Sequence, residues 1–195
     1  MRPKWIPLLA LAAALAGGGC YTRLHAGGLS GDGRGAVGMG TLGFGYVAQQ
    51  PEGRIAIGMT GGFAGGGGEA DDSVLVGLEL LGDIGLKQLG RGRRLSGLVR
   101  LHAAGTGYMK EGEASDRDSK LEGTLAEFGA GLGYDILGGD DGGAVSHMLF
   151  GVVGTAGYVD FSGQDARWGL GAMFELTAGF DLARMLDGVG EPDDD

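Results

Sequence analysis

The sequence is poor in the residues that would mark several classes of protein. It has one cysteine, Cys20, so no disulfide can form within the chain. Only 4 of its 195 residues are proline, and its 46 glycines follow no three-residue period, which excludes a collagen helix. Lys and Arg number 15 against 25 Asp and Glu. The formal charge of −10 disfavours nucleic acid as a partner, because binding phosphates requires a basic surface.

The sequence also lacks an apolar run long enough for a membrane-spanning helix, which needs about 20 residues. The run at 6–16 follows Arg2 and Lys4 and precedes small residues, a pattern typical of a secretory signal peptide. We therefore expect an exported protein.

Residues 1–20 resemble a bacterial lipoprotein signal, in which the cysteine after the small residues is lipidated and becomes the first mature residue. The resemblance implies that Cys20 is lipidated. It also implies sorting to the outer membrane, because Tyr21 stands where an aspartate favours retention at the inner membrane. An ordinary A-x-A cleavage site at 14–16 is the alternative, and it would leave a free thiol.

What the chain does have is alternation with a period of two. Within 167–182 every even position is apolar, and the odd positions are mostly glycine, charged or polar, which predicts a strand. Glycine- and Asp-rich turn segments separate eight such stretches, and no sustained helical period occurs. The predicted strands are 21–28, 34–48, 53–64, 73–88, 93–109, 119–136, 144–160 and 166–182.

These strands predict an all-β fold, an antiparallel up-and-down β-barrel of eight strands that spans a membrane. Most are longer than the about 9–11 residues that a tilted transmembrane strand needs. We expect a lipoprotein-like signal peptide at 1–19, the barrel at 20–184 and a disordered acidic tail at 185–195. The segment 144–160 is ambiguous, with apolar residues on both parities.

Two barrel types fit this pattern, a soluble lipocalin-like barrel with an apolar interior and an outer-membrane barrel with an apolar exterior. The face opposite the apolar one is largely glycine, which weakens a water-exposed strand but suits a crowded barrel interior. Over roughly 21–182 the pattern resembles the small eight-stranded outer-membrane barrels. The resemblance implies two aromatic girdles, and we predict Phe63, Tyr158 and Trp168 at the outer rim and Tyr46, Tyr134 and Phe180 at the inner rim.

Four charged residues lie near the middle of predicted strands on the non-lipid face: Glu79, Arg100, Glu127 and Glu175. We predict that they meet inside the barrel, with Arg100 on the strand between those of Glu79 and Glu127. Because three acids face one arginine, one carboxyl is expected to be protonated or to use His102 as its partner. This predicted interior charge cluster is structural rather than catalytic.

Other motifs predict no chemistry. The match to G-x-G-x-x-G at 38–43 is expected by accident in so glycine-rich a chain, and no βαβ unit surrounds it. Ser146 and His147 are adjacent, so we expect them on opposite faces. The three histidines lack ligand spacing. The acidic loop at 111–118 is interpreted as solvated, with a weak calcium site as the less favoured alternative. No catalytic residue, metal or cofactor is predicted.

The predicted function is that of an outer-membrane (lipo)protein barrel with a structural or interaction role and no wide pore. Its expected partners are outer-membrane lipid and envelope proteins that contact the outward loops. One alternative is a soluble periplasmic lipocalin-like barrel that binds a small apolar ligand. A second alternative is an outer-membrane enzyme that modifies lipid A.

Overall fold

In the computed structural model, the described residues are 19–31, 36–50, 52–66, 73–89, 93–108, 121–137, 145–160 and 166–181. They form eight strands of 12 to 16 residues. None of these residues belongs to a helix long and apolar enough to cross a membrane. The strands are β1 (Gly19–Ser30), β2 (Ala36–Gln50), β3 (Gly53–Gly66), β4 (Ser73–Gln88), β5 (Arg94–Tyr108), β6 (Leu121–Asp135), β7 (Val145–Asp160) and β8 (Arg167–Phe180).

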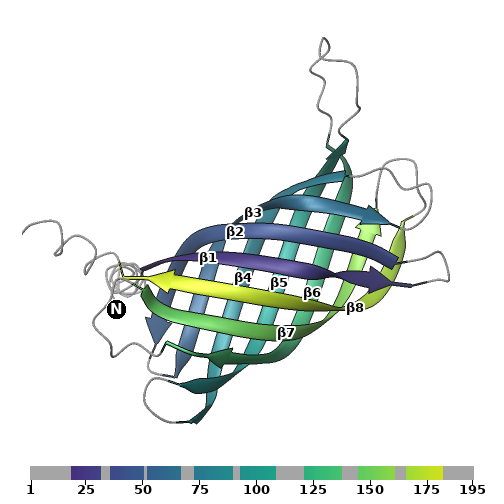
Figure 1. The fold of residues 1–195 in the computed structure, drawn as a ribbon. Helices are drawn as coiled ribbons and strands as arrows, with labels where there is room; N and C mark the ends of the chain where they lie inside the picture. Colours follow the sequence, from purple (N-terminus) through teal and green to yellow (C-terminus); the bar gives the residue numbers. More distant parts are fainter. Residues whose placement is uncertain are drawn as a thin grey trace, which may run out of the picture.

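The strands close into one antiparallel barrel (Figure 1). Each pairs with its neighbour in the sequence, and β1 pairs with β8 to close the sheet. The start of β1 and the end of β8 therefore lie at one end, called here the terminal end, and the opposite end is the distal end. The predicted all-β antiparallel barrel of eight strands is confirmed, and each predicted strand corresponds to an observed one with ends shifted by a few residues.

Side chains alternate between the interior and the outside of the barrel, as the period of two predicts. The outward positions carry many large apolar side chains in direct contact with the surroundings. They include Leu42, Phe44, Ile55, Ile57, Met59, Leu78, Ile84, Phe128, Leu132, Val152, Leu170 and Phe174. The charged residues buried in these strands point inward. The barrel thus has the reverse of a lipocalin's arrangement.

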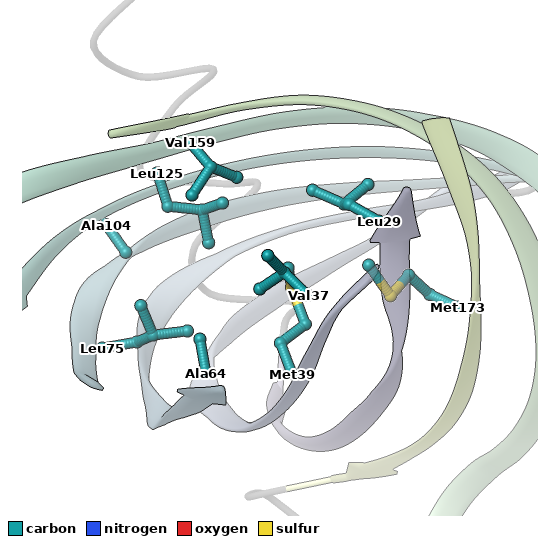
Figure 2. Packing of buried hydrophobic residues seen from close by; sticks show 9 residues of the cluster. All are labelled: Leu29, Val37, Met39, Ala64, Leu75, Ala104, Leu125, Val159 and Met173. Carbon is teal, nitrogen blue, oxygen red and sulfur yellow. The ribbon is translucent and has the colours of Figure 1, made fainter. Parts of the chain in front are cut away.

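The distal part of the interior contains an apolar cluster, which the sequence analysis did not predict. Nine buried side chains pack together there (Figure 2). They are Leu29, Val37, Met39, Ala64, Leu75, Ala104, Leu125, Val159 and Met173. Inward Leu149, Val153 and Val159 of β7 explain why 144–160 shows apolar residues on both parities. The nine residues of the cluster that contains Leu29 and Met173 are called the distal plug, and Leu149 and Val153 are not part of it.

Candidate functional site

The middle of the barrel holds a buried network of ion pairs. Arg100 of β5 forms a two-bonded pair with Glu175 of β8, and its Nε lies 2.8 Å from Glu175 Oε2. Arg23 of β1 is paired with Glu79 of β4, whose other oxygen accepts a hydrogen bond of 2.7 Å from the Tyr21 hydroxyl. Arg23 Nη1 is also 3.5 Å from Glu175, so the two pairs form one central network.

A second group of charges extends the network toward the terminal end. Arg100 Nη1 lies 2.8 Å from Asp83 Oδ1, and Arg54 Nε lies 3.4 Å from the other oxygen of Asp83. Arg54 Nη2 also contacts Asp135 Oδ2 at 2.9 Å. Acidic and basic side chains therefore alternate along the lumen, and each charge is compensated by a neighbour of opposite sign.

Two histidines occupy the distal side of this network, next to the plug. His102 Nδ1 lies 2.8 Å from Glu127 Oε2. Both ring nitrogens of His25 are buried without a protein hydrogen-bond partner. These residues border a cavity of about 10 Å³ together with Arg23 and Arg100, a space on the scale of one water molecule. At this level the described side chains fill the interior and leave only this small space between them.

All five residues of the predicted interior charge cluster, Glu79, Arg100, Glu127, Glu175 and His102, are buried inside the barrel. The expected use of His102 as the partner of one carboxyl is seen at Glu127, whereas Glu79 pairs with an arginine outside the predicted cluster. Arg100 contacts Glu175 and Asp83, while Glu127 contacts His102 and Glu79 contacts Arg23.

Sequence reasoning missed Arg23, Arg54, Asp83 and Asp135, which belong to the same network. Arg23 and His25 lie on β1, whose outward face carries Thr22, Ala26 and Gly28 and a single large apolar residue, Leu24. That weak contrast hid the alternation. Their alternate spacing with Tyr21 was the available signal, because residues i, i+2 and i+4 of a strand share one face.

Ser146 and His147 were predicted to point to opposite faces, yet their side chains contact each other. Ser146 Oγ lies 3.2 Å from His147 Nδ1, although adjacent strand residues normally point to opposite faces. The register of β7 against β8 shifts between Val145 and His147, and such an irregularity locally disturbs the alternation. Among the described residues no group of three His, Cys, Asp or Glu is placed to hold a metal ion. The acidic loop at 111–118 lies outside the described residues.

The six predicted girdle residues all lie on the outward parity of their strands. Tyr46, Tyr134 and Phe180 are near the terminal end, and Phe63, Tyr158 and Trp168 are near the distal end. Phe63 and Trp168 are strongly exposed, and the rings of Tyr158 and Trp168 meet edge to face with centroids 5.5 Å apart.

Cys20 lies at the terminal end on the outer face of β1. It is exposed, and its register partners on both sides are the outward aromatics Tyr46 and Phe180. The thiol therefore lies at the level of the terminal-end aromatics, facing away from the lumen.

No protein-family profile and no curated protein matches the sequence. Among solved structures, the chain is similar to the N-terminal β-barrel domain of OprF from Pseudomonas aeruginosa. The two are 14% identical with a TM-score of 0.36, and the match covers 82% of this chain and 98% of that one. Similarity at this level is too low to inform function.

Proposed function

We propose that the protein spans the bacterial outer membrane as a small closed barrel with a structural or interaction role. The observation that best supports this proposal is the distribution of side chains. Large apolar residues face outward over the barrel, and paired charges face inward. Water would penalise so large an exposed apolar surface, whereas hydrocarbon favours it. Closure of the sheet also satisfies every strand edge, which a membrane-spanning sheet requires.

The same distribution disfavours a lipocalin-like ligand carrier, because the middle of the lumen is charged and filled. The described residues give little support to a catalytic role, because Ser146 Oγ contacts His147 Nδ1 but no described carboxylate pairs with His147 to complete a hydrolase triad. The closed lumen supports a role without a wide pore. We propose outer-membrane lipid as the surrounding partner, with other envelope proteins as candidates for the outward loops.

We further propose that the barrel is lipid-anchored at Cys20. The lipoprotein-like signal supports this, as does the exposed position of Cys20 between two outward aromatics at the terminal end. Acyl chains attached there would enter the leaflet next to that aromatic level. The terminal end would then face the periplasm.

Membrane extraction tests the spanning proposal. The protein should remain in the outer-membrane fraction after a carbonate wash and migrate on gels differently before and after heating, as folded barrels do. Release by carbonate from the Cys20→Ser variant would show that the lipid anchor alone holds the protein, and the spanning barrel would be wrong.

A further inference from the structure

A hollow of about 640 Å³ crosses the outward face of the barrel from β3 to β8. It exists because three outward positions on neighbouring strands are small: Ala103 on β5, Ala126 on β6 and Ala156 on β7. Ala103 and Ala126 are direct register partners, so no large side chain fills the surface between β5 and β6 at this level.

Larger apolar side chains form the walls of this alanine-floored hollow. Leu101 and Phe128, themselves register partners, lie toward the terminal end. Trp168 bounds the hollow on β8, and its ring rests edge to face against Tyr158. Glu79, His102 and Glu127 also border the hollow, but their side chains are buried within the barrel. The surface offered to an occupant is therefore hydrocarbon.

The dimensions of the hollow indicate which kind of molecule can occupy it. From Ile57 on β3 to Trp168 on β8 it crosses five strand spacings, a length of about 24 Å at ~4.8 Å per strand. The hollow is lined by only two adjacent rows of outward residues, which lie two positions apart along each strand. That spacing is about 7 Å, narrower than an α-helix, whose diameter with side chains is about 10–12 Å. An extended hydrocarbon chain fits this shape, and a transmembrane helix does not.

We propose that this hollow binds one acyl chain of a membrane lipid. The inference rests on the proposed membrane-spanning function. Trp168 is close to the start of β8 at the distal end, so the lipid belongs to the distal leaflet, with its headgroup near Trp168 and its chain running obliquely toward Ile57. Aromatic rings at the membrane interface suit that end of the lipid. The bound chain exchanges more slowly than the lipid around the rest of the barrel.

The test compares two substitutions of the same kind on one strand. Ala126→Leu fills the hollow, whereas Ala130→Leu adds the same volume to the same outward face of β6 outside it. Each protein is reconstituted in phosphatidylethanolamine and phosphatidylglycerol vesicles that contain phosphatidylcholine spin-labelled near its chain end. Electron spin resonance then counts the motionally restricted lipids, and native mass spectrometry counts the lipids retained in mild detergent.

We expect the wild type and Ala130→Leu to retain the lipid in mild detergent, and Ala126→Leu to lose it and to restrict about one lipid fewer in vesicles. Equal counts for the two variants would overturn the proposal. The proposal would also be overturned if the wild type were a dimer that Ala126→Leu dissociates, because a second copy of the chain would then occupy the hollow. Carbonate washing of the same membranes distinguishes failure of the membrane-spanning proposal from failure of the lipid-site proposal. If the wash releases the wild-type protein, the spanning barrel is refuted. If the barrel stays inserted but the two variants bind equal numbers of lipids, only the lipid site is refuted.

Discussion

At the scale of single residues, Arg100 is the junction of the interior network. It contacts Glu175 and Asp83 and donates to the backbone carbonyls of Gly82 and Val99. Removing it leaves Glu175 and Asp83 buried with only the longer contacts to Arg23 at 3.5 Å and to Arg54 at 3.4 Å. The carbonyl contacts also hold the guanidinium against the wall of the barrel. Its position is therefore fixed both by the backbone of β4 and β5 and by the carboxylates in the lumen.

Arg100→Ala should lower the free energy of unfolding by about 3–5 kcal/mol, the usual consequence of breaking a buried pair from one side. Urea unfolding in vesicles, followed by gel mobility, measures the change. Adding Glu175→Gln should recover part of the loss, because Glu175 loses its two-bonded partner and keeps only the longer contact to Arg23. Glu127→Gln is the matched control, since Glu127 contacts His102 instead. Wild-type stability of Arg100→Ala would show that the network does not form.

Cys20 carries a second prediction at the same scale. Palmitate supplied to cells should label the wild-type protein, and Cys20→Ser should abolish the label, because no other cysteine exists in the chain. The spanning barrel should still assemble in this variant, since the thiol is exposed and forms no disulfide. Labelling that persists in Cys20→Ser would disprove the lipid anchor.

At the scale of elements, glycine fixes how closely neighbouring strands approach. Gly45 on β2 and Gly58 on β3 are register partners. A Cβ on Gly45 would lie 2.3 Å from the carbonyl oxygen of Ile57 and 2.4 Å from the Cα of Gly58. These are backbone atoms, which cannot move aside without displacing β3. Gly40, on the same strand, has open space at the corresponding position.

Gly45→Ala should therefore destabilise the barrel by about 1–3 kcal/mol, the typical effect of overpacking. Gly40→Ala should be neutral or slightly stabilising, because it only restricts the unfolded chain. Unfolding midpoints of the two variants under identical conditions provide the comparison. Equal midpoints would mean that the β2–β3 approach is looser than the structure shows.

At the scale of the whole molecule, an eight-stranded barrel encloses a space that side chains just fill. Here the filling is layered: the central network of charges lies beside the distal plug, which closes the lumen with apolar side chains. A hydrated ion would have to separate the ion pairs and then enter a hydrocarbon layer.

Purified protein in planar bilayers should accordingly show no porin-sized conductance. Single-channel recording at moderate voltage is the measurement. The double variant with Leu29→Ala and Leu125→Ala removes two side chains of the distal plug. Recording from it under the same conditions is a more sensitive test of whether the lumen conducts ions. Large, stable steps from the wild type would mean that the lumen opens or that the chain assembles with more strands.

The sequence alone was sufficient for the strand number, the approximate strand ends and the inward direction of Glu79, Arg100, Glu127 and Glu175. A period of two and the chemistry of turns are local properties, so the sequence displays them directly. The sequence could not provide the pairing of charges. Arg100 and Glu175 lie on β5 and β8, which are not neighbours in the sheet, and they meet only across the lumen.

Two further features depended on the tertiary structure for the same reason. The distal plug gathers one or two side chains from every strand, and no single strand contains a signal for it. The alanine-floored hollow depends on register, because Ala103 and Ala126 become neighbours only when β5 and β6 are aligned. Local alternation determined which face each residue occupies. Closure and register, which are set by the whole sheet, decided which residues meet.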